Sequence, residues 1–409
     1  MKILCADYIL TCDSEFSIIR DGAVCFDEKI LDIGKKDDVI KNNPYAKVKY
    51  LSKNSCILPG LINTHLHLEF SANKATLIYG DFTNWLKSVI EKREELQKQC
   101  LESCYEDTMD EMLESGTVAF GAVSSFGADM ISCFETPQRV VYFNEILGSN
   151  PDFLDENIKN FEKRLQKSLE LANDSFLPGV FIHAPYSTHP MLAKYIINIA
   201  KKEDLRISTH FMESFSEREW LNNGSGKFRE FLSGFTEDVE PMYSAMEYLE
   251  LFEGIDTLFA HCNVADKKEL AFISKNGSIS HCIRSNRLLG NPMLNLKKVK
   301  ELGVNLTIGT DGLSSNTSLN LWDEMRTFIY AHNEEDLLKA SKDALLATTR
   351  NGAKSLRLVE NGTLEIGKHA DLVSVVLPDS VEDTAQLPLE LILHTKSIKS
   401  GYIAGERYV

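Results

Sequence analysis

Residues 56–67 have the sequence CILPGLINTHLH, an apolar run that ends in two histidines one residue apart. Similar apolar runs recur along the chain up to residue 312, and most of them also end in polar side chains. We expect each run to be a buried β-strand. The further runs are GTVAFGAVSS (116–125), RVVYFNEILG (139–148), GVFIHAPYS (179–187), RISTHFME (206–213), TLFAHCN (257–263), GSISHCIRS (277–285) and VNLTIGTDG (304–312).

Amphipathic stretches that are typical of helices separate several of these runs, at residues 82–100, 156–172, 190–202 and 266–275. Eight strands that alternate with helices predict an α/β fold, a (β/α)₈ TIM barrel in which the carboxyl ends of the strands meet at one face. An open sheet that binds a dinucleotide is not favoured, because no Gly-x-Gly-x-x-Gly follows a strand.

The two ends of the chain differ in style from this middle part. Residues 1–55 and the C-terminal stretch favour short strands of alternating polarity separated by turns, with no helix of useful length before residue 56. We expect one small β-sandwich built from both termini. The predicted division is residues 1–56 and 359–409 for this domain and residues 57–358 for the barrel.

Composition limits the classes of partner. The formal net charge of −16 argues against nucleic acid or an anionic membrane as a partner. No run approaches the roughly 18 apolar residues of a membrane span, and Asp7 and Asp13 interrupt any signal-peptide core. The nine cysteines form no Cys-x-x-Cys pair, so we expect reduced, mostly buried thiols in a cytoplasmic protein.

The histidines indicate a metal site. His65 and His67 are two residues apart on a strand and therefore project from the same face, a spacing that suits Zn²⁺ or Fe²⁺. The alternative is two histidines held by hydrogen bonds at the rim of the barrel. Histidine placement favours the metal, because six of the ten histidines fall at predicted strand ends, namely His65, His67, His183, His210, His261 and His281.

Three more side chains complete the predicted chemistry. Asp311 ends the last strand and offers a carboxylate opposite His65, His67 and His210, although an acid before glycine is also a common turn or cap residue. Glu213 follows His210 by three residues and is a candidate proton shuttle, the alternative being a solvated loop residue. His261 is a candidate to orient or deprotonate water, or else a supporting hydrogen-bonding residue.

Over almost its full length the chain resembles the amidohydrolase superfamily. The quoted elements are PGLINTHLHLEF (59–70), THFMES (209–214), AHCN (260–263), GTDGLSSNTSLNLWDEMR (309–326), ATTRNGAKSL (347–356) and GTLEIGKHADLV (362–373). The resemblance implies a (β/α)₈ barrel with a terminal β-sandwich. It also implies a hydrolase with one divalent metal ion, Zn²⁺ or Fe²⁺, held by His65, His67, His210 and Asp311, and with Glu213, His261 and Asp311 as catalytic residues.

Within that superfamily the chain is similar to the branch that deaminates purine nucleosides and related heterocycles. The fourth strand offers no Lys for a carbamate bridge, which implies one metal ion rather than two. The segment HAPYS implies that His183 contacts the substrate, and the stretch after the first strand implies that Glu91 or Glu94 meets the ribose. Where this branch often has a second histidine after strand six, the chain has Val264.

The segments HLHLEFSANK (65–74) and YGDFTNWLKSVI (79–90) are most similar to deaminases of menaquinone biosynthesis. Their purine nucleoside carries a benzoate, so Arg284 and Arg287 are candidates to bind a carboxylate, a surface role being the alternative for both. Members of this branch are commonly dimers, which implies a possible homodimer here. Deaminases of other adenine nucleosides or of guanine, a chlorohydrolase, and a non-catalytic barrel remain as alternatives.

Overall fold

The structure is a computed structural model that describes residues 1–73, 75–100, 102–234 and 239–409. Eight strands form one sheet in chain order, and those from β8 onward pair in parallel with their neighbours. Amides of Thr310 and Asp311 donate to the carbonyl of His65 and so join the last strand to the first. This confirms the predicted (β/α)₈ barrel. Its strands are β6 (Leu61–Leu66), β7 (Thr117–Ser124), β8 (Arg139–Ile146), β9 (Phe176–Ile182), β10 (Arg206–Phe211), β11 (Thr257–His261), β12 (Gly277–His281) and β13 (Asn305–Ile308).

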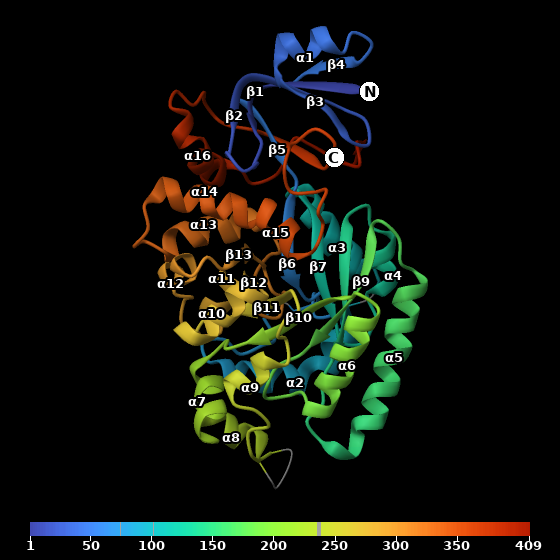
Figure 1. The fold of residues 1–409 in the computed structure, drawn as a ribbon, viewed down its shortest axis with the longest axis vertical. Helices are drawn as coiled ribbons and strands as arrows, with labels where there is room; N and C mark the ends of the chain where they lie inside the picture. The colour runs from blue at the N-terminus through green and yellow to red at the C-terminus, as the bar shows by residue number, and fades with distance from the viewer. Residues whose placement is uncertain (74, 101, 235–238) are drawn as a thin grey trace. The chain divides into compact units, whose positions relative to one another are not determined.

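Helices follow the strands around the barrel (Figure 1). α5 packs on β8 and β9, α6 packs on β9 and β10, and α10 packs on β12. Their ends are set by local chemistry: Asp266 and Glu269 form a capping box at the start of α10, and Pro190 opens α6. The helices between residues 82 and 301 are α2 (Phe82–Gln99), α3 (Glu102–Glu114), α4 (Met130–Glu135), α5 (Leu154–Glu170), α6 (Pro190–Lys202), α7 (Phe215–Asn223), α8 (Lys227–Leu232), α9 (Ala245–Glu250), α10 (Lys267–Asn276), α11 (Ile283–Leu288) and α12 (Leu296–Glu301).

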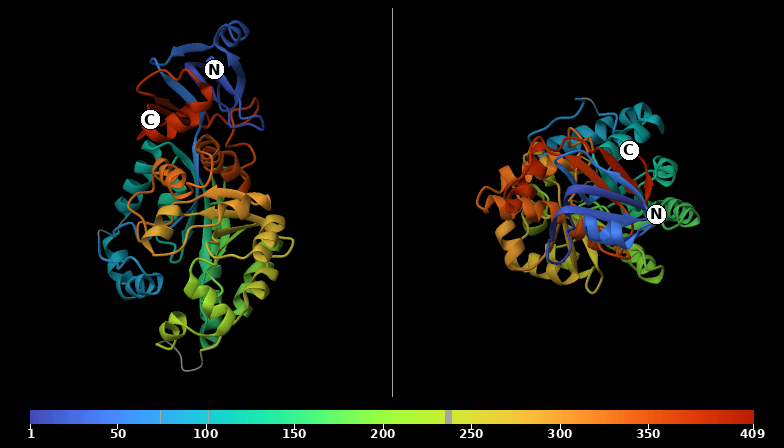
Figure 2. Two further views of the ribbon diagram at one scale, coloured as in Figure 1. Left: turned by 90° about the vertical axis from the view of Figure 1, so that its left-hand side faces the viewer. Right: turned by 90° about the horizontal axis from the view of Figure 1, so that it is seen from above.

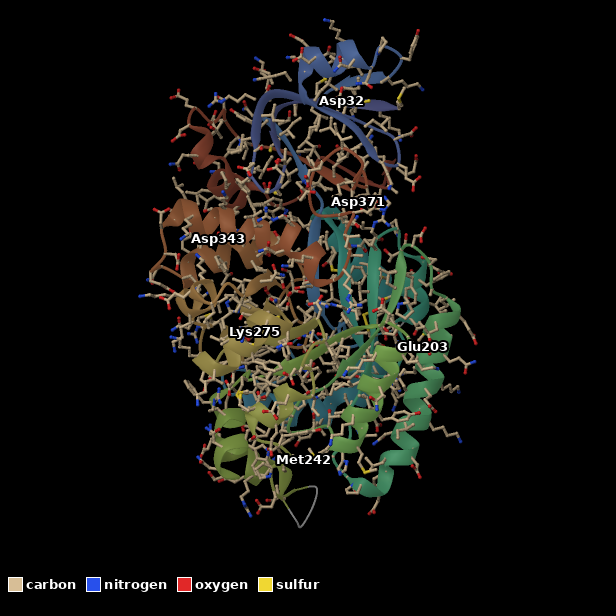
Figure 3. The ribbon with its side chains drawn as sticks, in the orientation of Figure 1. Asp32, Glu203, Met242, Lys275, Asp343 and Asp371 are labelled. Atoms are coloured by element: carbon tan, nitrogen blue, oxygen red, sulfur yellow. A yellow bond between two sulfur atoms is a disulfide. The ribbon has the colours of Figure 1, made fainter. Side chains whose placement is uncertain are left out.

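Strands from both ends of the chain form a second, mostly antiparallel sheet, as expected from their alternating polarity (Figure 2). On β1, Leu4 and Ala6 contribute to one apolar cluster, while Ile3 and Cys5 pack with Val39 of α1 in another. Asp371, labelled in Figure 3, accepts from Asn361 and from the amide of Ala404 and ties these C-terminal segments together. The strands are β1 (Lys2–Leu10), β2 (Ile18–Phe26), β3 (Ile30–Lys35), β4 (Lys47–Tyr50), β5 (Ser55–Pro59), β14 (Leu372–Val376), β15 (Ser400–Ile403) and β16 (Glu406–Arg407).

The chain clusters into two compact units, one of residues 1–63, 109–120 and 320–409 and one of residues 64–108 and 121–319. The first unit includes the remaining α-helices, which are α1 (Lys36–Asn42), α13 (Leu321–Ala331), α14 (Leu337–Ala347), α15 (Arg350–Ser355) and α16 (Leu387–His394). We propose that the functional domains are the barrel at residues 57–358 and the terminal β-domain at residues 1–56 and 359–409. Within the described residues no helix is long and apolar enough to cross a membrane.

Two local expectations were wrong. The run CILPGLINTH is not one strand, because Ser55–Pro59 belongs to the terminal sheet and Leu61–Leu66 to the barrel. At Gly60 between them, an added Cβ would lie 2.3 Å from a methyl carbon of Val118, so a larger residue would clash. The N-terminal part also contains the seven-residue helix α1, which buries only Val39 and therefore gives no apolar periodicity to detect.

The expectation that all cysteines are reduced was wrong for one pair. Cys100, which follows α2, forms a disulfide with Cys104 of α3, and the two Cα atoms are 5.3 Å apart at a separation of four residues. The other seven cysteines are free and buried, as expected. A Cys-x-x-Cys motif is therefore not needed, because two cysteines four residues apart are close enough to pair here.

We expect denatured protein alkylated without reductant to be modified at seven of its nine cysteines, and at all nine after reduction. Intact-mass spectrometry counts the modifications. In the Cys104→Ser control every remaining cysteine should react without reductant, because Cys100 loses its partner. Modification of all nine cysteines in unreduced wild type would show that this disulfide does not form.

Candidate active site

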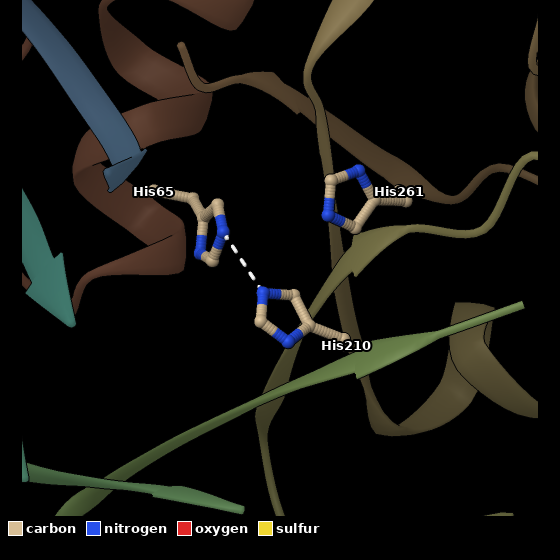
Figure 4. Close-up of side chains that lie close together, drawn as sticks. All are labelled: His65, His210 and His261. Atoms are coloured by element: carbon tan, nitrogen blue, oxygen red, sulfur yellow. Dashed lines mark hydrogen bonds between the residues drawn. The ribbon is translucent and has the colours of Figure 1, made fainter. Parts of the chain in front are cut away.

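The predicted metal ligands come together at the carboxyl ends of the barrel strands. His65 Nε2 lies 3.3 Å from His210 Nε2, and Asp311 Oδ1 lies 3.9 Å from His65 Nε2 and 3.7 Å from His67 Nε2. His261 brings a further ring into the same space (Figure 4). The potential ligand atoms of His65, His210 and His261, and those of His65, His67 and Asp311, lie within 4.8 Å of one another.

These distances fit a cation. Nitrogen and oxygen ligands about 2.0–2.1 Å from Zn²⁺ lie roughly 3.3 Å apart at tetrahedral angles and farther apart at wider angles. Burial lowers the pKa of His65, His67 and His210, so their rings are neutral and carry a lone pair at neutral pH. Among the described residues Nδ1 of buried His65 has no hydrogen-bond partner, so this ligand is held by packing rather than by a second polar contact.

Hydroxyl groups fix the carboxylate of Asp311. Its Oδ2 accepts from Ser285 Oγ at 2.7 Å and from Ser315 Oγ at 2.8 Å, which leaves Oδ1 beside the histidines. Burial by itself would raise the pKa of Asp311, but the neighbouring histidines and Ser285 lower it, and the net shift is downward. Asp311 is therefore a carboxylate at neutral pH, as a metal ligand must be.

His261 is oriented by amides. Its Nδ1 lies 3.0 Å from Oδ1 of Asn286, whose own amide nitrogen donates to Asn263. This network assigns the proton to Nδ1 and leaves Nε2 free to accept, 3.7 Å from Glu213 Oε2. The supporting residues were missed in the sequence, because asparagines in loops are common and carry no spacing signal.

Glu213 is buried in the wall of the pocket that His67, His210, His261 and Asp311 also line. Its amide and that of Met212 donate to the two carboxylate oxygens of Glu217 at 2.7 and 2.9 Å, and Asn291 donates to Glu213 Oε1. Burial raises the pKa of Glu213 well above its ordinary value, and the nearby carboxylates of Asp311 and Glu217 raise it further. A protonated Glu213 can donate a proton to a bound base.

Backbone conformation contributes to this geometry. Met212, His261, Cys262 and Asp311 all have φ between 50° and 71°, in the left-handed region that non-glycine residues rarely adopt. Each follows or ends a barrel strand at the site. Such conformations cost about 1–2 kcal/mol per residue and cluster where a side chain must be aimed at a ligand.

Aromatic and apolar side chains also line this pocket. Trp85 donates from Nε1 to the carbonyl of Ser314 at 2.9 Å, which ties α2 to the loop after β13. His183 lines the pocket with Nδ1 2.5 Å from Ser187 Oγ, and burial lowers the pKa of His183 to about 4. The other lining residues are His67, Phe70, Phe82, Leu86, Val89, Ser125, Glu145, Tyr186, His210, Glu213, His261 and Asp311.

Three predicted substrate residues do not line this pocket. Glu94 is exposed beside Lys98 and borders a different cavity. Arg284 donates to Ser318 and Thr317, and Arg287 is exposed. In contrast, sequence reasoning missed Ser125 and Glu145, although an acid near the end of the apolar run RVVYFNEILG is a signal that was available.

His281 is buried below the pocket rather than in its wall, with Nδ1 3.4 Å from the amide nitrogen of Asn286. Asn286 also holds His261, so His281 is coupled to the site through that amide. His281 is not among the residues that line the pocket, so its position favours a supporting role over a substrate contact.

Glu217 generates a pH-dependent prediction. Burial raises its pKa from 4.5 to about 7, although two backbone amides and Arg218 oppose the shift. The folded protein thus binds the proton of Glu217 more tightly than the unfolded chain does. The contribution of this proton to the free energy of unfolding is complete below about pH 4.5 and is lost as the pH rises to about 7. We expect this group to remove about 1.4 kcal/mol of unfolding free energy per pH unit in that window, and Glu217→Gln to abolish this contribution.

Urea unfolding at about pH 5 and about pH 7 measures the effect as the change in unfolding free energy between the two conditions. The control is Glu219→Gln, which replaces an exposed carboxylate two residues away and should keep the wild-type pH dependence. The same pH dependence in Glu217→Gln and in wild type would contradict the assignment.

The chain is similar to several known deaminases in sequence and in fold. Aminodeoxyfutalosine deaminase of a Nitratiruptor species is 43% identical over 394 residues, 96% of each chain. Adenosine deaminase of Helicobacter pylori is 36% identical over 414 residues, 100% of each chain. The crystal structure of Helicobacter pylori aminofutalosine deaminase in complex with methylthio-coformycin has a TM-score of 0.96 at 35% identity, over 100% of both chains. Residues 56–407 match the model of the amidohydrolase family, and the chain belongs to that family.

Proposed function

We propose that the protein is a metal-dependent deaminase that converts 6-amino-6-deoxyfutalosine and water to futalosine and ammonia in menaquinone biosynthesis. The observation that carries the proposal is the position of buried Glu213, whose pKa burial raises, beside His261 and the predicted metal ligands in a pocket lined partly by aromatic side chains. The names of the 43% identical relative and of the structural neighbour support the choice of substrate.

The proposed cofactor is one divalent ion, Zn²⁺ or Fe²⁺, held by His65, His67, His210 and Asp311. When bound, such an ion polarises a water molecule and lowers its pKa. β9 (Phe176–Ile182) contains no lysine, so the carbamate that bridges two ions in other metallohydrolases has no source there. Imidazole and carboxylate ligands serve both metals, so the choice between them is left to metal analysis.

The side chains then supply the proton transfers. Asp311 and His261 hold the attacking water and accept its proton as its oxygen bonds to C6 of the purine. Glu213 donates a proton to ring N1, which makes C6 electrophilic. The amino group takes up the proton that Asp311 and His261 received from the water, the C6–N bond breaks, and ammonia leaves. The C6 hydroxyl loses its remaining proton to Glu213 as the C6 carbonyl forms, which restores the starting protonation of each residue.

The proposal keeps His183 as a substrate contact, because it lines the pocket and burial holds its ring neutral, so that it can exchange a hydrogen bond with a purine nitrogen. It assigns no role to Glu94, Arg284 or Arg287, which lie outside the pocket wall. A homodimer remains an expectation that the proposed chemistry does not require, because every residue of the mechanism comes from one chain.

The substrate assignment is tested by assaying 6-amino-6-deoxyfutalosine, methylthioadenosine, S-adenosylhomocysteine and adenosine side by side. We expect the highest kcat/KM for 6-amino-6-deoxyfutalosine, with ammonia released in equal amount to purine product. A higher kcat/KM for adenosine, the substrate in the name of the 36% identical relative, would contradict the proposed substrate but not the proposed deamination reaction. Chloride release from a chlorotriazine without purine turnover would overturn both.

Glu213→Gln should retain about one metal ion per chain but lose kcat by about 10²–10⁴-fold, because the amide cannot donate an acidic proton to the ring. Metal content by plasma mass spectrometry is measured on the same samples as turnover. Glu230→Gln, which changes an exposed carboxylate, is the control and should behave as wild type. Near-normal turnover by metal-loaded Glu213→Gln would remove Glu213 from the mechanism.

A further inference from the structure

Glu145 is a buried carboxylate in the pocket that the proposed mechanism does not use. It lies near the carboxyl end of β8, lines the pocket and is only 2% exposed. Its neighbour Asn144 donates outward to Ser168 of α5, and alternation along a strand therefore directs Glu145 into the barrel. The position of the Glu145 side chain is therefore set by strand β8 and not by a loop.

The hydrogen bonding of Glu145 is incomplete. Ser125 Oγ donates to its Oε2, and Arg164 donates to its backbone carbonyl. Its Oε1 is buried and has no hydrogen-bond partner among the described residues. An acceptor buried without a partner is costly, so a partner that arrives with the ligand would relieve that cost.

The chemistry of the position identifies the kind of partner. Oε1 of Glu145 can accept from one hydroxyl, and Oε2 keeps a second lone pair after accepting from Ser125, so the carboxylate can accept from two adjacent hydroxyl donors. The carboxylate also lies within 4.8 Å of ring nitrogens of His183 and His210. Glu145 therefore lies beside His183, which the proposed function assigns as a purine contact, and a nucleoside carries its ribose on that purine.

We propose that Glu145, positioned by Ser125, binds the vicinal ribose hydroxyls of the substrate and thereby selects ribonucleosides over 2′-deoxyribonucleosides. The inference rests on the proposed function, and it replaces Glu94, which the sequence suggested for the ribose and which lies on the surface. Ser125 is a positioning residue that holds one carboxylate oxygen and leaves the other for the ligand.

A matched pair of ligands tests the inference by binding. Coformycin and 2′-deoxycoformycin mimic the purine deamination transition state and differ only in the 2′-hydroxyl. We expect metal-loaded wild type to bind coformycin roughly 100-fold more tightly by calorimetry, because a hydrogen bond to a buried charge is lost in the deoxy compound. In Glu145→Gln this preference should fall to within a few fold, because coformycin affinity should fall much more than 2′-deoxycoformycin affinity, which loses only the contact to the 3′-hydroxyl.

Controls separate this role from a structural one. Ser125→Ala should lose about 10-fold in the preference, because the carboxylate stays but is less well held, and it serves where Glu145→Gln does not fold. Glu156→Gln, exposed on α5, should keep the wild-type ratio. A purely structural role for Glu145 would weaken both ligands equally and would overturn the inference.

Three further outcomes are decisive. Loss of bound metal from Glu145→Gln would make the carboxylate a metal ligand and overturn the inference. Equal affinity of wild type for the two ligands would also overturn it while leaving the proposed deaminase function intact. Failure of wild type to bind either ligand or to turn over any purine nucleoside would overturn the proposed function, and the inference with it.

Discussion

His65 and His210 face each other through ring nitrogens 3.3 Å apart, and Asp311 holds a carboxylate oxygen 3.7 Å from His67. Removing these four polar side chains from water is costly. The cost is visible in the three imidazoles, because burial disfavours their charged form and lowers each pKa. A cation between them offsets the cost, because neutral imidazoles and one carboxylate are the ligands that it needs. The barrel makes the arrangement possible, since the carboxyl ends of its strands converge on one face.

The rest of the site holds these groups at fixed angles. Ser285 and Ser315 fix Asp311, Asn286 fixes the tautomer of His261, and Glu217 fixes the backbone before Glu213. Positive φ values at strand ends store backbone strain in the same places. A site that is held in this way meets the transition state without reorganising, which is how fixed dipoles and charges lower a barrier.

Two buried glutamates divide the pocket. Glu213 lies near His261 and has a raised pKa, which suits a proton donor, while Glu145 lies on another strand with one oxygen unsatisfied among the described contacts. The Trp85 contact to Ser314 ties α2 to the loop after β13, and Trp85 adds an aromatic side chain to the lining of the same pocket. The pocket thus presents an apolar surface for a heterocycle beside separate polar positions for chemistry and for recognition.

Periodicity was sufficient to predict all eight barrel strands, the sheet formed by both termini and the convergence of His65, His67, His210 and Asp311, because the positions of strand ends follow from pattern and topology. It missed α1, the boundary at Gly60 and the Cys100–Cys104 disulfide, since these depend on short polar segments and close approaches that leave no periodic signal. The family resemblance, confirmed by the match over residues 56–407, added the roles of side chains but placed the ribose contact on an exposed helix position.

The sequence by itself therefore determined the barrel, the family and the identity of the candidate metal ligands. Only the tertiary structure decided which carboxylates are buried, which hydroxyl or amide holds each one, and that Glu145 rather than Glu94 lies in the pocket. The physical reason is that burial and hydrogen bonding depend on segments far apart in the chain. A pKa or an unsatisfied oxygen exists only after those segments have packed together.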